Sequence, residues 1–273
     1  MKPITSAAIC YPGGVFEYLV LGGAALGAYG WERLRQARLV RRYHAAIRQL
    51  DDEAQVALHL AEREAQARHQ PLTPLHLVYG VLQDAQLAAL IGELGGDVDA
   101  IEQHTLALLD EPLRPEHIPA LHHAQHELGI VLGTAIESAR AHARQATCAD
   151  LCARLAATRA GALLERGGID PLVLQFRCVH GHPSPPIERP GEATVNVVIR
   201  NDDLTTAQLV FELLHDELGL APDRAREVTQ AAHAGGKAIV GQFASADART
   251  RLERARARLR SARAPLWLGV EPC

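Results

Sequence analysis

Residues 195–220, VNVVIRNDDLTTAQLVFELLHDELGL, decide the fold of the C-terminal part, because a strand pattern meets a helix pattern there without a spacer. Val195, Val197 and Ile199 alternate with polar residues, which is typical of a strand with one buried face. Val198 is the one position that departs from this alternation. A helix is predicted directly after the strand.

An amide and two carboxylates, Asn201, Asp202 and Asp203, occupy the junction between this strand and this helix. The segment TTAQ that follows predicts a capping box, with Thr205 as the N-cap and Gln208 three residues later. Because Thr205 caps the helix in this pattern, Asn201 and Asp202 are available to hold a positively charged group. Asp203 is assigned to the positive end of the helix dipole.

The rest of the C-terminal part predicts two more helices and two more strands. One helix begins after Pro222 and ends at the glycine pair 235–236, a common C-terminal signal. Residues 237–244 and 265–271 predict strands, and the helix between them has Ser245 as its predicted N-cap. The order β-α-α-β-α-β predicts a small α+β domain with a sheet packed on helices. The predicted buried stripe of the last helix is Leu252, Ala255, Leu259 and Ala262.

Residues 43–182 predict an all-α domain in which one arrangement of helices occurs twice. In the first copy Thr73 is a predicted N-cap with Pro74 at the first helical position, and the glycine pair 95–96 divides two short helices. The pattern recurs after about 75 residues, which favours a tandem pair packed as one domain over a solenoid of short repeats. The predicted buried face of the first helix is Ala54, Ala57, Leu58, Ala61 and Ala65.

This double repeat ends near FRCVHG at 176–181 and resembles the N-terminal domain of Clp-type AAA+ unfoldases, the Clp R domain. The resemblance implies a docking platform for substrates and adaptors that has no chemistry of its own. Residues 183–193, PSPPIERPGEA, predict a semi-rigid linker to the C-terminal domain at 194–273.

Three segments of that C-terminal domain follow the pattern of a known family: VNVVIRNDDLTT at 195–206, AAHAGGKAIVG at 231–241 and PLWL at 265–268. With these segments at the family's spacing, the domain resembles the ClpS adaptors. In that family the domain binds proteins whose first residue is bulky and apolar, and passes them to a Clp unfoldase.

The resemblance implies that Asn201, Asp202 and His233 bind the α-amino group of the substrate protein, with Thr205 at the pocket wall. An ammonium group has three donors and a positive charge, which a carboxylate and an amide oxygen satisfy with charge-assisted hydrogen bonds. By the same register the side-chain pocket is lined by Ala207, Val210, Thr229, Ala232 and Leu266.

This chain departs from the family at three points. Family members commonly have bulky residues such as methionine at the positions of Ala207 and Thr229, so we expect either a wider pocket that discriminates less against β-branched residues or weaker binding. Arg200 is an internal cation that competes for Asp202, and the pocket is self-blocked if the two pair. The adaptor-like domain also shares one chain with a helical module, so its docking surface is occupied intramolecularly or the module recruits a second partner.

Composition and missing motifs exclude other functions. A formal net charge of -4 argues against a general nucleic-acid binder. The chain contains no P-loop, H-E-x-x-H or G-x-S-x-G motif, so we predict no cofactor, no metal site and no enzymatic activity. The arginines of 249–263 predict a solvated helix face, and a docking surface for an acidic partner is the alternative.

Residues 1–42 contain an apolar run at 15–31 that is followed by several arginines. This order is typical of a short membrane anchor that keeps the rest of the chain cytoplasmic, and a glycine-spaced extension is the alternative.

Together the sequence predicts an α+β chain that acts as a non-enzymatic adaptor. It would bind N-terminal segments of substrate proteins and deliver them to a Clp-type AAA+ protease. The alternative is a non-delivering or inhibitory protein that docks on a Clp unfoldase or adaptor through its helical repeats.

Overall fold

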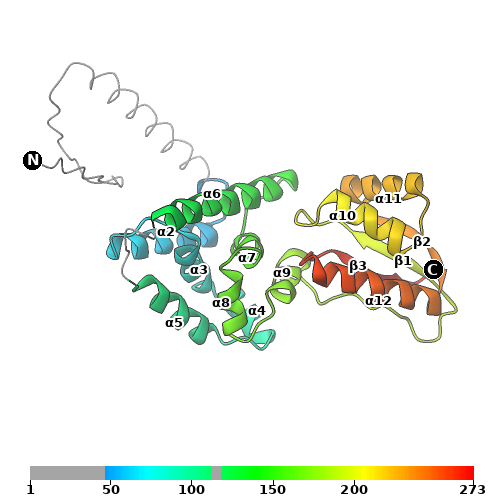
Figure 1. Ribbon diagram of the computed structural model, residues 1–273, viewed down its shortest axis with the longest axis horizontal. Coiled ribbons are helices and arrows are strands. Elements are labelled where there is room, and N and C mark those ends of the chain that lie inside the picture. Colours follow the sequence, from blue (N-terminus) through cyan, green and yellow to red (C-terminus); the bar gives the residue numbers. More distant parts are fainter. Residues whose placement is uncertain (1–46, 112–117) are drawn as a thin grey trace, which may run out of the picture. The chain divides into compact units, whose positions relative to one another are not determined.

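The computed structural model describes residues 47–111 and 118–273 (Figure 1). The apolar run at 15–31, predicted as a membrane anchor, lies outside these residues. Across the residues that are described, no helix combines the length and the apolar character needed to cross a bilayer.

The helical domain consists of two sets of four helices (Figure 1). The first set is α2 (Asp52–Ala67), α3 (Pro74–Leu82), α4 (Ala85–Glu93) and α5 (Val98–Leu109). The second is α6 (Ile118–Ala141), α7 (Cys148–Ala156), α8 (Gly161–Arg166) and α9 (Pro171–His180).

Equivalent residues begin and end the helices of the two sets. Thr73 is the N-cap of α3 as predicted, and Thr147 is the N-cap of α7 in the second set. Gly95 and Gly168 follow α4 and α8 with φ angles of 84° and 82°, a left-handed conformation that favours glycine. The five residues predicted to form the buried face of the first helix are the buried residues of α2. Close packing of α2 on α3 depends on Gly80, where a Cβ atom would lie 2.0 Å from the Ala57 carbonyl oxygen.

The C-terminal domain has the predicted order β-α-α-β-α-β, and the predicted α+β class is confirmed. Its three strands form an antiparallel sheet in the order β2-β1-β3. Helix α10 continues into a short π-helical segment, η2. The elements are β1 (Thr194–Arg200), α10 (Ala207–Glu212), η2 (Leu213–Glu217), α11 (Pro222–Gly235), β2 (Lys237–Ala244), α12 (Ser245–Ser261) and β3 (Trp267–Glu271).

Strand β1 is buried on both faces. Val195, Val197 and Ile199 belong to the core that the sheet forms with α10, α11 and α12. Val198 points to the opposite face and is 0% exposed, because it packs with Trp267 of β3 and with Phe176 of α9. The departure from alternation at Val198 therefore marks a second buried face of the sheet. Phe176 of the helical domain covers part of this face.

The segment between the two domains, 183–193, contains no helix or strand and lies against β3. The amide of Val270 donates to the Pro186 carbonyl oxygen at 3.1 Å. A Cβ atom at Gly269 would lie 2.4 Å from Cβ of Pro185, so this glycine permits the close approach.

Two predicted helix caps are wrong by one residue. The N-cap of α10 is Thr206, since the Thr205 hydroxyl donates to Asp202 instead. The N-cap of α12 is Ala244, and the Ser245 hydroxyl donates to the Glu192 carbonyl oxygen. The buried stripe of α12 begins one turn earlier than predicted, so that Ala262 is exposed and the buried residues are Ala248, Leu252, Ala255 and Leu259.

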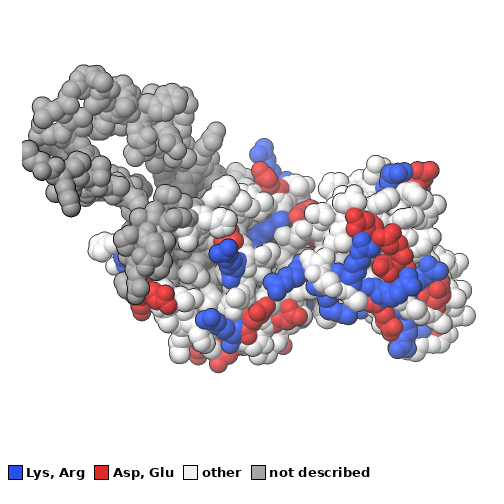
Figure 2. Space-filling model, viewed as in Figure 1, with Lys and Arg blue, Asp and Glu red and all other residues white. Residues whose placement is uncertain are grey.

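The arginines of α12 mostly pair with carboxylates of the same domain. Arg258 contacts Glu212 at 2.6 Å and Asp216 at 2.8 Å, and Arg254 contacts Glu217 at 3.1 Å. Figure 2 shows basic and acidic side chains side by side on this part of the surface. Paired charges of this kind leave little of the uncompensated positive field that steers nucleic acid.

Candidate functional site

A cavity of about 230 Å³ lies where β1 ends, between α10 and α11. It brings together all nine residues predicted for the amino-group site and its side-chain pocket, although they come from three separate segments of the chain. The residues that line it are Ile199, Asn201, Asp202, Asp203, Thr205, Ala207, Val210, Thr229, Ala232, His233 and Leu266.

Asp202 is a buried carboxylate at this cavity, with a residue exposure of 7%. Its Oδ1 accepts hydrogen bonds from the amides of Leu204 at 2.8 Å and Thr205 at 2.6 Å. Its Oδ2 accepts one hydrogen bond, from the Thr205 hydroxyl at 2.9 Å. A carboxylate oxygen has two lone pairs, so Oδ2 retains capacity for one more donor. Asp202 thus orders the loop before α10, which sequence reasoning did not assign to it, and keeps an acceptor for a ligand.

Asn201 and His233 are placed together by the backbone. The backbone amide of Asn201 donates a hydrogen bond to the Gly236 carbonyl oxygen at 2.9 Å. This bond holds the start of the loop at the end of α11. Gly236 caps α11 with a φ of 73°, and His233 lies in the last turn of that helix. Within the described ranges, neither the Asn201 side-chain amide nor the His233 ring makes a hydrogen bond. Both residues line the cavity.

The apolar part of the cavity has a buried base and small residues around it. Val210, Ala232 and Leu266 are all buried, and Ala207 is exposed. The Thr229 hydroxyl donates to the Ala225 carbonyl oxygen at 2.8 Å, so its proton is used within α11. The lining thus has room for an apolar side chain.

Arg200 does not pair with Asp202, so the condition under which the pocket would be self-blocked is not met. Its guanidinium contacts Glu271 at 3.3 Å and lies 4.5 Å from the centre of the Trp267 ring. Glu271 also contacts Lys237 at 2.6 Å. Lys237, and to a smaller extent Arg200, lowers the pKa of the Glu271 carboxyl. Both side-chain partners of Arg200, Glu271 and Trp267, are on β3, away from the loop.

Asp203 contacts the helical domain, which the sequence did not indicate, and its assignment to the helix dipole stays a prediction. Its side chain accepts a hydrogen bond from the Ser138 hydroxyl of α6, and His142 Nδ1 lies 3.6 Å from the same carboxylate. Its carbonyl oxygen accepts a bond from Arg154 of α7 at 3.1 Å. No sequence signal indicated these contacts, because Ser138 and Arg154 are far away along the chain.

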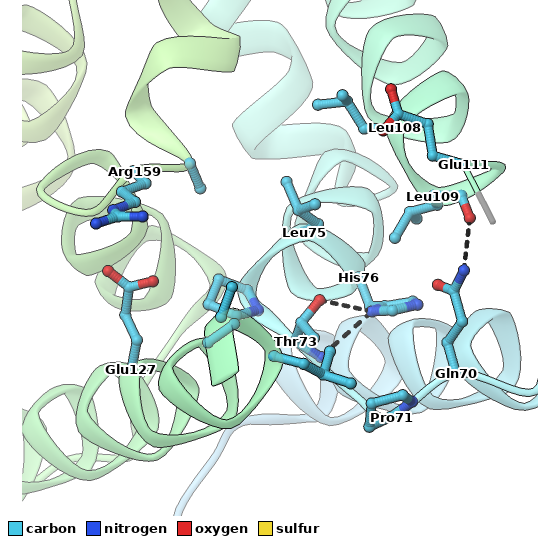
Figure 3. Close-up of a pocket in the computed structure, with 15 residues that line it drawn as sticks. Gln70, Pro71, Thr73, Leu75, His76, Leu108, Leu109, Glu111, Glu127 and Arg159 are labelled. Carbon is cyan, nitrogen blue, oxygen red and sulfur yellow. Dashed lines mark hydrogen bonds between the residues drawn. The ribbon is translucent and has the colours of Figure 1, made fainter. Parts of the chain in front are cut away.

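A second cavity, of about 300 Å³, lies in the helical domain (Figure 3). Thr73 and His76 are its buried polar residues, and burial, with a smaller contribution from Arg68, lowers the pKa of the histidine to about 4. The amide of Thr73 donates to Nδ1 at 3.2 Å, so the proton of the neutral ring is on Nε2. Figure 3 shows Glu127 and Arg159 on one side of this cavity.

In the described part of the chain, no three His, Cys, Asp or Glu side chains gather closely enough to hold a metal ion. The thiols of Cys148 and Cys152 are buried. Burial raises the pKa of Cys148 to about 12, and the contact with Cys178, together with burial, raises that of Cys152.

The geometry defines a small α+β domain whose cavity combines a buried carboxylate with an apolar base. Residues 191–269 match the family model described as ATP-dependent Clp protease adaptor protein ClpS. Residues 49–149 match the model of the Clp repeat (R) N-terminal domain. The predicted resemblance to a ClpS domain fused to a Clp R domain is therefore confirmed.

A solved structure of Agrobacterium tumefaciens ClpS2 bound to L-phenylalaninamide is also similar, with 29% sequence identity and a TM-score of 0.29. The similarity covers 31% of this chain and 100% of that one. None of the curated proteins matches the chain.

Proposed function

We propose that this chain is a non-enzymatic adaptor that binds the free N-terminus of substrate proteins and delivers them to a Clp-type AAA+ protease. The observation that carries the proposal is the acceptor capacity of buried Asp202 beside the unbonded side chains of Asn201 and His233. The match of this domain to the ClpS adaptor model supports the partner class.

The chemistry favours a charged terminus over an internal peptide bond. An α-amino group has a pKa of about 7.7–8.0, so most of it is an ammonium at neutral pH. Asp202 Oδ2 and the Asn201 side-chain oxygen accept hydrogen bonds from two of its N–H groups, and His233 accepts a third hydrogen bond or donates one to the first carbonyl oxygen. An acetylated terminus has one donor and no charge, and leaving the buried carboxylate unpaired costs about 1–3 kcal/mol or more.

The apolar base of the cavity, with Val210, Ala232 and Leu266, is the place for the first side chain of the substrate. Ala207 and Thr229 leave space beside it, because neither side chain is large. We expect the site to accept Leu and Phe and to discriminate weakly against β-branched Val. A single methylene changes binding in an apolar pocket by about 1–3 kcal/mol, so these small residues matter.

Fluorescence anisotropy on the full chain tests the proposal. Labelled peptides that begin with Phe, Leu, Val or Asp are compared, each with a free and with an acetylated N-terminus. We expect micromolar or tighter binding of the free Phe and Leu peptides and at least tenfold weaker binding of every acetylated one. Equal affinity for free and acetylated peptides would overturn amino-group recognition.

The cavity of the helical domain supports a second role, in which the chain docks on a Clp unfoldase or adaptor without delivering cargo. A degradation assay separates the two roles. An adaptor accelerates Clp-dependent degradation of a substrate that begins with Phe, and a non-delivering protein slows it or leaves it unchanged.

A further inference from the structure

The loop that carries Asp202 is held from two sides. Within its own domain, the backbone amide of Asn201 donates a hydrogen bond to the Gly236 carbonyl oxygen. The Asp202 carboxylate accepts hydrogen bonds from the backbone amides of Leu204 and Thr205. On the other side, Asp203 is bonded to the helical domain through both its carboxylate and its carbonyl oxygen. Asp202, the acceptor that faces the cavity, is therefore directly followed by Asp203, which is hydrogen-bonded to the helical domain.

We infer, on the basis of the proposed function, that the helical domain is part of the recognition site, with Ser138 and Arg154 as positioning residues. Ser138 fixes the Asp203 side chain, and Arg154 fixes its backbone. Together they hold the loop in the conformation that aims Asp202 Oδ2 at the cavity. Orienting an acceptor before the ligand arrives raises affinity, because less freedom is lost on binding.

A second contact between the domains lies next in the chain to a residue that lines the cavity. His180 Nε2 lies 2.8 Å from the Pro265 carbonyl oxygen, and Pro265 directly precedes Leu266 of the cavity base. Beside it, Phe176 of α9 packs with Val198 and Trp267. The helical domain thus touches chain segments at both the polar end and the apolar end of the cavity.

The charge of Arg154 separates a positioning role from a purely electrostatic one. Burial lowers the pKa of this guanidinium, while Asp203, Asp150 and Asp202 act in the opposite direction, and an arginine stays charged in either case. Removing a cation from beside Asp202 and Asp203 would, by electrostatics alone, strengthen the attraction for an ammonium. Weaker binding after Arg154→Ala therefore reports lost positioning.

The test uses the full chain with Ser138→Ala, Arg154→Ala and the double variant. Thr134→Ala is the matched control, because the Thr134 hydroxyl donates only within α6. We expect the double variant to bind a free Phe peptide about tenfold more weakly, each single variant to weaken it by a few-fold, and the control to leave it unchanged. Ser138→Thr, which keeps the hydroxyl that Ser138→Ala removes, should retain most of the affinity of the parent chain.

Amide hydrogen exchange without ligand gives an independent readout. Exchange at Leu204 and Thr205 should become faster in the double variant, while the cores of both domains keep their protection. Unchanged exchange at these two amides, unchanged affinity, or tighter binding by Arg154→Ala would overturn the positioning role. If the parent chain binds no free N-terminus, the proposed function fails, and the exchange measurement still decides whether Ser138 and Arg154 hold the loop.

Discussion

The cavity of the helical domain at His76 and the cavity of the C-terminal domain at Asp202 are similar in size and differ in their buried polar groups. The cavity of the helical domain, about 300 Å³, contains His76, which is neutral at physiological pH and bonded to the cap of its own helix. The cavity of the C-terminal domain, about 230 Å³, contains the Asp202 carboxylate with spare acceptor capacity. Volume alone does not separate them. In the proposed function, the charge of Asp202 is what makes the cavity of the C-terminal domain select a charged ligand.

The largest expected effect comes from removing that charge. Asp202→Asn keeps the shape of the side chain but replaces the carboxylate with a neutral amide. Charge-assisted hydrogen bonds contribute about 1.5–3 kcal/mol, so we expect the affinity for a free Phe peptide to fall by about 10- to 100-fold. Anisotropy measures this loss. Asp223→Asn, at an exposed carboxylate of α11, is the control, and equal affinity of Asp202→Asn and the parent would remove the basis of the comparison.

The buried histidine of the other cavity predicts an effect of similar size on stability. At pH above about 6.5 His76 is neutral in both the folded and the unfolded chain. Between 6.5 and its folded-state pKa of about 4, only the unfolded chain takes up a proton, so stability falls as pH falls through this window. From pH 7 to pH 5 we expect a loss of about 1–2 kcal/mol from this group.

Chemical denaturation at the two pH values measures this loss. His76→Gln should flatten the dependence, and His59→Gln, at an exposed histidine of α2, should not. A slope that is unchanged by His76→Gln would contradict a buried neutral ring.

The pH dependence of peptide binding has the opposite direction. The peptide ammonium loses its proton above about pH 8, so affinity should fall by about tenfold per pH unit beyond that point. Titrations between pH 7 and pH 9.5 check this. The weak binding of the acetylated peptide should not change over the same range, and a flat profile for the free peptide would argue against ammonium recognition.

The smallest expected effect concerns the width of the pocket. Ala207→Met adds a long side chain beside the apolar base and should disfavour a Val peptide more than a Phe peptide. We expect the ratio of the two affinities to change by about threefold to tenfold. Thr206→Ala, at the N-cap of α10, controls for general loosening of that helix. An unchanged ratio would place the first side chain elsewhere.

The sequence predicts elements whose signals are local, and fails where the partner is distant. The N-cap Thr73, the glycine pair at the end of α11 and the order of helices and strands along the C-terminal domain all follow from short patterns. Val198 fits no local pattern, because its partner Phe176 belongs to another domain. Arg200 points away from Asp202 for a similar reason, since its partners Trp267 and Glu271 come together with it only in the sheet.

The candidate site also has features that the sequence predicts and features that it does not. Family resemblance selects nine residues, and the fold brings all nine to one cavity. Two features of the site were missed: the hydrogen bonds by which Asp202 orders its own loop, and the bonds from Ser138 and Arg154 to Asp203. Both depend on a loop conformation and a domain contact that residue types alone do not specify.

An NMR titration of the isotope-labelled full chain with a Phe peptide tests the central claim most directly, because it observes both cavities at once. We expect the amide signals of Leu204, Thr205 and His233 to shift in proportion to bound peptide, while those around His76 stay in place. Shifts confined to the surroundings of His76, or identical shifts with the acetylated peptide, would contradict recognition of a charged N-terminus at Asp202.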